Sequence, residues 1–188
     1  MNARPGADRR GRRVTEAALV FVVDRDRLLL QRRHREPNAG FWSPPGGKLH
    51  RGEAPRAAAR RELLEETALD FGLERFEPRG TVFHEGPGPE ESWRQHLFLV
   101  EARGVSASPP CVVPGEDPCR WFAIEEVLGG RVAMPSADAH YFPGVLDATR
   151  PAASWLVVHR PDGSVARAEA SFENPGRDGG GGEPEATE

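Results

Sequence analysis

The chain has 188 residues, enough for a single domain, with 38% apolar residues, 29% charged residues and a formal net charge of −4. This composition argues against a dedicated nucleic-acid-binding protein. The sequence contains no apolar run of transmembrane length, and from its polar, Arg-rich first residues we expect no secretory signal. Two cysteines, Cys111 and Cys119, are too few for a disulfide framework, so we expect a cytoplasmic protein that does not bind membranes.

Glycine and proline contribute 21 and 18 residues, which predicts long loops or disordered ends. Residues 1–13 carry five arginines and almost nothing apolar, so we predict a disordered basic arm there. Residues 174–188 are rich in Gly and Glu and are predicted to form a disordered tail. One folded domain is therefore expected over residues 14–173.

The domain is predicted to begin with a β-hairpin and to continue through a loop into a helix. Apolar runs at 15–23 and 27–33 flank a short Asp-Arg-Asp turn, which is typical of a hairpin. Glycine and prolines interrupt residues 37–45 and indicate a loop. Pro55 is suited to the first turn of a helix, because its missing N–H has no intrahelical partner there. We expect this helix to run to about Ala68.

The second half of the chain is dominated by extended segments. Pro161-Asp162-Gly163 separates the last two of them, and Asp-Gly between extended runs predicts a hairpin. Strands mixed with two or three helices predict an α/β or α+β fold. The expected strands are 79–84, 93–102, 120–123, 152–159 and 165–172, and residues 124–128 are expected to form a helical turn.

Three acids cluster within the predicted helix. Glu62, Glu65 and Glu66 fall on one arc of about 100° of a helical wheel, where like charges repel each other unless they share a cation. Oxygen ligands of this kind suit Mg²⁺ or Mn²⁺. The alternative is a solvated helix face with ion pairs such as Arg61–Glu65.

The spacing around these acids distinguishes the two interpretations. Gly47 is followed after five residues by Glu53, and after seven more by Arg61-Glu62-Leu63, one residue and Glu65-Glu66. This pattern resembles the Nudix box and meets each of its charged positions. One position departs from it: Ala68 stands where the family has a glycine that eases the end of the helix, so we expect a shifted helix terminus.

The resemblance implies both a fold and a chemistry. The fold is a Nudix-type α/β/α sandwich with a mixed sheet, and the activity is hydrolysis of a phosphoric anhydride bond by a metal-activated water. It implies that Glu62, Glu65, Glu66 and the Gly47 carbonyl bind Mg²⁺ or Mn²⁺. Arg61 would orient a glutamate, and Glu53 would give electrostatic support. The general base stays open between the box glutamates and an acid outside the box.

The flanking residues are similar to MutT-type purine triphosphatases, which remove 8-oxo-dGTP. Lys48, the only lysine in the chain, is expected to contact phosphate, and Glu116 to complete the catalytic or metal set. Asp138, within residues 134–143, matches an acid that reads the base, and Trp42 is a candidate for stacking on it. Two departures leave fewer groups to read the purine edge and predict weaker discrimination among bases. Ser43 stands where that branch has Asn, and Ala137 where it has a second acid.

The leading hypothesis is therefore a nucleoside triphosphate pyrophosphohydrolase with 8-oxo-dGTP as a candidate substrate. Other nucleoside diphosphate-linked substrates stay open: a dinucleoside polyphosphate, ADP-ribose, an RNA 5′ end or an intermediate of secondary metabolism. A catalytically silent nucleotide sensor is a further alternative, although such modules commonly lack a box glutamate. RNA binding through the basic arm is disfavoured by the net charge of −4. The expected partner is a nucleotide, and the expected assembly is a monomer or homodimer.

Overall fold

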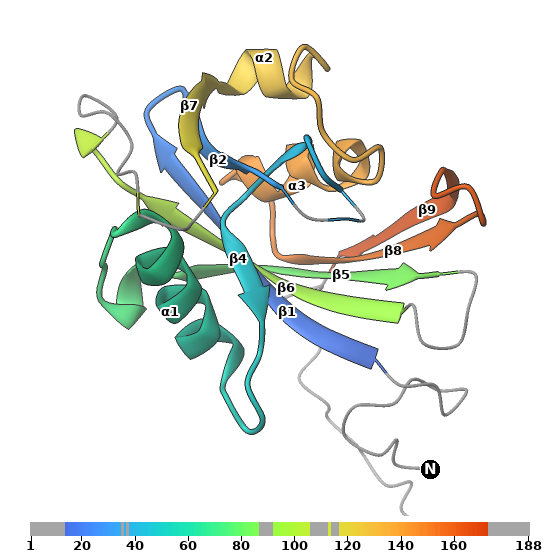
Figure 1. Cartoon of the computed structure of the whole chain (residues 1–188), viewed down its shortest axis with the longest axis horizontal. Helices are drawn as coiled ribbons and strands as arrows, with labels where there is room; N and C mark the ends of the chain where they lie inside the picture. Colours follow the sequence, from blue (N-terminus) through green and yellow to red (C-terminus); the bar gives the residue numbers. More distant parts are fainter. Residues whose placement is uncertain are drawn as a thin grey trace, which may run out of the picture.

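The computed structural model describes residues 14–34, 36, 38–86, 92–105, 113 and 117–172, which form a mixed sheet with helices on both faces (Figure 1). This confirms the predicted α/β sandwich. The strands in the described part of the chain are β1 (Val14–Asp24), β2 (Arg27–Arg32), β3 (Trp42–Ser43), β4 (Gly46–Lys48), β5 (Glu77–Glu85), β6 (Ser92–Glu101), β7 (Cys119–Ala123), β8 (Ala153–His159) and β9 (Val165–Phe172). The helices are α1 (Pro55–Thr67), α2 (Ile124–Leu128) and α3 (Phe142–Leu146), with short 3₁₀ turns η1 (Leu73–Arg75) and η3 (Asp138–His140).

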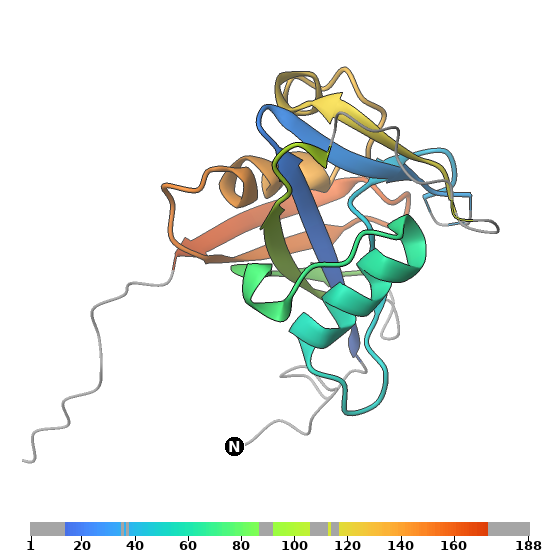
Figure 2. The same cartoon turned by 90° about the vertical axis from the view of Figure 1, so that its left-hand side faces the viewer.

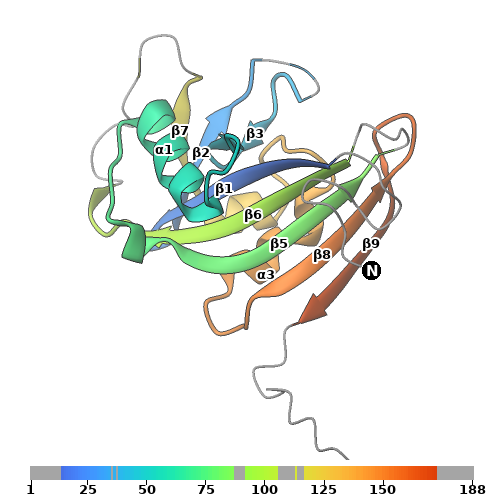
Figure 3. The same ribbon diagram turned by 90° about the horizontal axis from the view of Figure 1, so that it is seen from below.

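The strands follow the order β3-β2-β1-β6-β5-β8-β9, with β4 paired to β1 and β7 paired to β2. The β1–β6 and β5–β8 pairs are parallel, and the other pairs are antiparallel. Figure 3 shows β1, β6, β5, β8 and β9 side by side, with α1 over one end of the sheet. The parallel pairs require long crossovers, and these crossovers carry the helices.

Two apolar cores lie on the two faces of the sheet because successive strand residues point to opposite sides. Val20 and Val22 of β1 face α1 and pack with its buried Leu63. Leu19 and Phe21 of the same strand face the segment that contains η3 and α3. Figure 2 shows α1 and this segment on either side of the sheet.

Several elements differ in extent from those predicted. The first hairpin, the helix and the final hairpin form where the sequence predicts them. The loop predicted over 37–45 contains the two-residue strand β3, and β4 follows directly after it. Strand β5 begins at Glu77, two residues before its predicted start, and the helical segment 138–146 was not predicted.

The described part of the chain contains no helix long and apolar enough to cross a bilayer. The predicted arm at 1–13 and tail at 174–188 lie outside the described residues, so the domain boundaries stay a prediction.

Candidate active site

Helix α1 presents the acid cluster because its opposite face is buried. Pro55 begins the helix, and Ala58, Ala59, Leu63 and Thr67 are the residues that α1 buries. The first three of these pack against the sheet, which is the main source of stability for a helix of this length. The remaining face carries the charged residues 60–62, 65 and 66, together with the exposed Leu64. The sequence pattern predicts this arrangement directly, since burial at positions 59 and 63 turns position 61 outward.

Arg61 connects the acids of the box through one guanidinium group. Its Nε and Nη2 atoms donate to the two carboxylate oxygens of Glu53, each at 2.9 Å. Its Nη1 atom donates to Glu62 at 2.8 Å and to Glu65 at 3.2 Å. Nη2 also donates to the carbonyl oxygen of Lys48 at 3.2 Å, which joins the helix to β4. A single cation thus fixes three carboxylates and a strand end.

Glu53 is held in its ionised form by this contact. The hydrogen bonds from Arg61 lower the pKa of Glu53 to about 2, assisted by the backbone N–H of His50, which donates to Glu53 at 2.8 Å. The same pairing raises the pKa of Arg61 above its ordinary value. Both oxygens of Glu53 are therefore engaged within the protein, a geometry suited to support rather than to direct metal ligation.

Glu66 faces β4 and β2. The backbone N–H of Gly46 donates to Glu66 at 2.8 Å. In the amide orientation that satisfies both groups, Gln31 donates to Glu66 and lies 3.2 Å from each carboxylate oxygen. These contacts tie the carboxylate to the sheet, so its position depends on the register of β4.

The two glycines of β4 both lie in close approaches, Gly46 to backbone and Gly47 to a side chain. Gly46 has φ +150°, and a Cβ atom on it would lie 2.1 Å from the carbonyl oxygen of Ala18. A Cβ atom on Gly47 would lie 2.5 Å from the carboxylate of Glu62. The backbone of Gly47 therefore abuts this carboxylate, and a side chain at position 47 would require the Glu62 carboxylate to move.

The oxygen ligands that the box supplies are of the type that hard divalent cations prefer. Carboxylates of Glu62, Glu65 and Glu66 rise from one helix face, and the backbone of Gly47 lies against the first of them. Among the described residues, however, no three His, Cys, Asp or Glu side chains already converge as a metal-binding group. Glu62 and Glu65 are instead turned toward Arg61, and the Glu65 side chain is 56% exposed. Each of these contacts engages one carboxylate oxygen, Oε1 of Glu62 and Oε2 of Glu65, so the two acids can contact Arg61 and an ion through different oxygens.

The candidate substrate residues near the box come from β3 and β4. Lys48 ends β4 and places its Nζ atom 5.2 Å from the centre of the Trp93 ring. Ser43 on β3 pairs with Gln31, the residue that faces Glu66. The ring of Trp42 packs edge-on against Phe122, with centroids 4.8 Å apart. Trp42 is thus partly engaged in the core, and β3 lies adjacent to the box.

Asp138 lies in η3 and is only 5% exposed. The hydroxyl of Tyr141 donates to its carboxylate at 2.6 Å. Burial raises the pKa of Asp138 to about 7, against the opposing effects of the Tyr141 hydrogen bond and the charge of Arg33. The backbone N–H of Trp42 donates to Ala133 at 2.8 Å, which links β3 to the segment that leads to Asp138.

Sequence reasoning missed a half-buried polar network on the same face of the sheet. His84 lies 3.0 Å from His159 and 3.2 Å from the Gln95 oxygen, and its ring contacts Tyr141 edge-on. Burial, with the neighbouring His159, lowers the pKa of His84 to about 4. The signal was available in the alternation of the strands, because His84 and Gln95 occupy positions in phase with the buried Val82 and Leu97.

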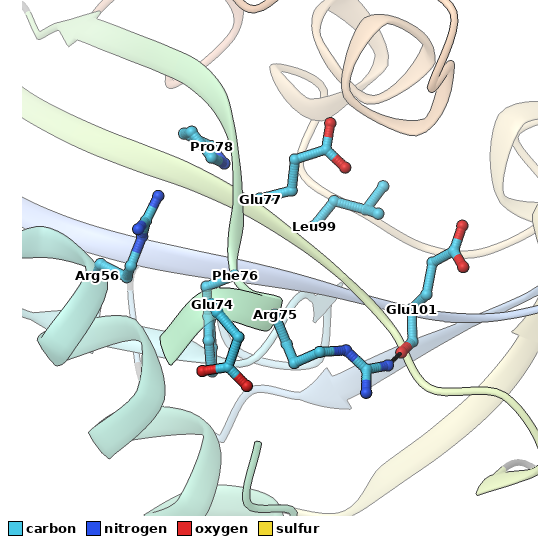
Figure 4. Close-up of a pocket in the computed structure, with 8 residues that line it drawn as sticks. All are labelled: Arg56, Glu74, Arg75, Phe76, Glu77, Pro78, Leu99 and Glu101. Atoms are coloured by element: carbon cyan, nitrogen blue, oxygen red, sulfur yellow. Dashed lines mark hydrogen bonds between the residues drawn. The ribbon is translucent and has the colours of Figure 1, made fainter. Parts of the chain in front are cut away.

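Two features fall outside this arrangement. Glu116 lies outside the described residues, so its predicted role stays a prediction. A pocket of about 410 Å³ (Figure 4) contains none of the predicted site residues. It is lined by Arg56, Glu74, Arg75, Phe76, Glu77, Pro78, Leu99 and Glu101. Two arginines and three glutamates give it no dominant charge for an anionic substrate.

Comparison with known proteins identifies the family profile and relatives that this chain matches. A family profile described as NUDIX domain matches residues 13–144. Oxidized purine nucleoside triphosphate hydrolase of Danio rerio is 33% identical over 133 residues, 70% of this chain and 80% of the relative. The protein of the same name from Mus musculus is 32% identical over 129 residues, 68% of this chain and 77% of the relative. The crystal structure of a MutT protein from Bacillus halodurans superposes with a TM-score of 0.69 at 23% identity, covering 86% of this chain and 100% of that one, which supports the fold.

Proposed function

Because the chain belongs to the NUDIX family and is therefore a hydrolase of phosphoric anhydride bonds, we propose that it cleaves a nucleoside triphosphate to the monophosphate and pyrophosphate. The proposed substrate is an oxidised purine nucleotide such as 8-oxo-dGTP, and the proposed cofactor is Mg²⁺, with Mn²⁺ as a substitute. The observation that carries the proposal is the Arg61 contact set, which assembles Glu53, Glu62 and Glu65 beside β4. The cytoplasmic location predicted from the sequence stays a prediction.

The residues proposed to hold the cation are Glu62, Glu65, Glu66 and the Gly47 carbonyl. A bound divalent cation supplies charge neutralisation to the diphosphate and lowers the pKa of a water molecule. Lys48, at the exposed end of β4, is proposed to pair with a phosphate oxygen. Arg61 keeps the acids oriented, and Glu53 keeps Arg61 in place.

We propose Glu65 as the group that accepts the proton of the attacking water. Among the three proposed carboxylate ligands, Glu65 has the most exposed side chain. Its contact with Arg61, at 3.2 Å, is also longer than the 2.8 Å contact between Glu62 and Arg61. Glu116 is the alternative acid from outside the box. The two assignments differ in the variant that loses the acidic limb of the pH–rate profile: E65Q in the first case and E116Q in the second.

On the base side, we propose that Asp138, Trp42 and Ser43 contact the purine. Support comes from the named relatives, which act on oxidised purine triphosphates and of which this chain covers 80% and 77%. A carboxyl group whose pKa lies at about 7 exchanges between donor and acceptor at neutral pH, so it can meet either pattern on a purine edge.

A different nucleoside diphosphate-linked substrate is the second candidate. Two of the positions proposed near the base supply few hydrogen-bonding groups, which favours this candidate. Ser43 offers one hydroxyl, and Ala137 is buried and apolar. Fewer hydrogen-bonding groups discriminate less strongly against other bases.

A substrate panel with Mg²⁺ separates the two candidates. The panel contains canonical dNTPs and NTPs, 8-oxo-dGTP, ADP-ribose and a dinucleoside tetraphosphate, with release of monophosphate and pyrophosphate as the readout. Preference for 8-oxo-dGTP supports the first candidate, and preference for ADP-ribose or the dinucleotide supports the second. Inactivity on every member contradicts the nucleotide assignment.

The box assignment is tested by Glu66→Gln. This change keeps the shape and the hydrogen bond from Gly46 but removes the charge, so kcat should fall by about two orders of magnitude or more. Far-ultraviolet circular dichroism should match the wild type. A variant that keeps the wild-type rate would remove Glu66 from the proposed ligands.

A further inference from the structure

Strand β5 contains an extra residue that redirects one side chain. Its register with β6 shifts between Pro78 and Gly80, which leaves Arg79 without a partner on β6. Gly80 has φ +118°, and a Cβ atom on it would lie 1.8 Å from the carbonyl oxygen of Ala153 on β8. Such bulges turn a strand locally and re-aim the side chain they carry. The bulge therefore depends on glycine at position 80.

The redirected side chain of Arg79 is buried beneath the end of α3. It is 3% exposed, and its Nε atom donates to the carbonyl oxygen of Val145 at 3.0 Å. Nη2 donates to the carbonyl oxygens of Gly144, at 3.3 Å, and of Asp147. Nη1 donates to Glu77 at 3.1 Å, a side chain that is itself 56% exposed. Three of the four contacts are thus with backbone.

These carbonyl groups belong to the last turn of α3 and the residue after it. The end of a helix concentrates partial negative charge on carbonyls that have no intrahelical partner. A buried guanidinium group both neutralises that charge and fills those hydrogen bonds. A lysine in its place would supply the charge without the planar fork that reaches several carbonyls at once. The five residues of α3 form few internal hydrogen bonds, so this external anchor matters more than it would for a long helix.

The anchored helix leads directly to Asp138. The N–H of Val145 donates to the carbonyl oxygen of Tyr141 at 3.0 Å, and the Tyr141 hydroxyl donates to Asp138 at 2.6 Å. At the middle of α3, a Cβ atom on Gly144 would lie 2.8 Å from the ring of Trp155, so α3 sits directly on β8. The segment 138–147 is therefore held as one unit against the sheet.

We propose that Arg79 is a positioning residue for substrate selection: by fixing the end of α3 it sets the place of Asp138. The inference rests on the proposed function, in which Asp138 contacts the base. The box lies on α1, which packs against the opposite face of the sheet, and the contacts of Arg79 named above include none of its residues. Loss of Arg79 should therefore weaken substrate binding and leave the chemical step intact.

The test is steady-state kinetics of the full chain with 8-oxo-dGTP and Mg²⁺, combined with amide hydrogen exchange. Arg79→Met should raise KM about tenfold or more and leave kcat within about twofold of wild type, because the base is misplaced and the metal site is not. Arg79→Lys should change KM in the same direction. Exchange should accelerate at residues 141–147 and stay unchanged at 55–67. Glu77→Gln is the matched control, since it removes the only carboxylate contact named above and leaves the carbonyl contacts, and it should keep the wild-type KM.

Two further variants make the outcomes separable. Tyr141→Phe breaks the bond to Asp138 without touching Arg79 and should reproduce the rise in KM. If Asp138→Ala raises KM while both Arg79 variants keep the wild-type KM, the positioning role is overturned and the proposed function stands. If Asp138→Ala leaves KM unchanged, the proposed base contact fails, and this inference fails with it. Should Arg79→Met not fold, Arg79→Lys decides the result by the same criteria.

Discussion

Arg61 shows how one side chain can organise a catalytic helix. Its planar group reaches Glu53, Glu62, Glu65 and the carbonyl of Lys48, contacts that join the loop before α1, the helix and strand β4. The two parallel hydrogen bonds to Glu53 fix the plane of the guanidinium group, and this plane directs Nη1 toward the two box acids. The acids are thereby held near one another in spite of the repulsion between their like charges.

A lysine at position 61 should not reproduce this geometry. Arg61→Lys keeps the charge but cannot form the two-pronged contact with Glu53 while also reaching Glu62. We expect kcat to fall by about two orders of magnitude, measured under saturating substrate and Mg²⁺. Arg60→Lys is the matched control, because Arg60 makes a similar two-pronged contact with Asp70 on the exposed surface. Equal effects of the two substitutions would contradict the special role of Arg61.

Residue spacing located the box, but not the environment of the residues outside it. The charged positions of the box recur at helical intervals, so their shared face could be predicted from sequence. The burial of Asp138 and its bond to Tyr141 depend on how η3 packs against the sheet, which no local pattern encodes. His84 likewise gained its partners Gln95 and His159 from other strands.

At the scale of elements, the end of α1 is strained because Ala68 stands where the family has glycine. Ala68 adopts the left-handed conformation, with φ 57° and ψ 11°, and its N–H donates to Leu64. The helix ends at Thr67, so alanine has not extended it. A Cβ atom in this conformation is strained by about 1 kcal/mol, which glycine avoids.

Ala68→Gly should therefore stabilise the protein by roughly 0.5–1 kcal/mol, measured by urea denaturation. Ala57→Gly provides a control of opposite sign, since this position lies inside α1 and should lose roughly 1 kcal/mol. A destabilised Ala68→Gly protein would contradict the strain argument. Activity should be unaffected, because Ala68 lies outside the contacts of Arg61 and Glu66.

Elements with a strong local signal were predictable, and those defined by pairing were not. The helix 55–67 has Pro55 at its start and an apolar stripe, and the last hairpin has Asp-Gly at its turn. Strands β3 and β4 have two and three residues, and their hydrogen bonds come from β2 and β1 rather than from local propensity. The bulge at Arg79 could not be predicted from sequence for the same reason, because it is defined by a register shift between β5 and β6.

At the scale of the whole molecule, the shifted pKa values of Asp138 and His84 change the stability of the fold with pH in opposite directions. The pKa of Asp138 is raised to about 7 by burial, so its contribution to stability is greatest at low pH and is lost as the pH rises toward 7. The pKa of His84 is lowered to about 4 by burial, so its contribution is full above its unfolded value of 6.5 and is lost as the pH falls. Between about pH 4 and 7 the two groups act in opposite directions.

Replacing Asp138 or His84 should leave the pH dependence of stability that is due to the other residue. Asp138→Asn should become less stable, relative to its own value at pH 7.5, as the pH falls from about 6.5 to 4.5, because only the His84 term then operates. His84→Gln should show the reverse slope and lose stability as the pH rises. Urea denaturation at four pH values checks both. Parallel curves for Asp138→Asn and wild type would contradict the shifted pKa of Asp138.

Lys48 has a practical consequence beyond catalysis. As the only lysine in the chain, it carries the only side-chain primary amine, and this amine lies 5.2 Å from the centre of the Trp93 ring at the end of β4. An amine-reactive fluorophore therefore has one side-chain attachment point, beside the box. Acylation removes the charge proposed to pair with phosphate, so bound substrate should slow the labelling of Lys48, and the rate of labelling would report occupancy of the site without a coupled assay.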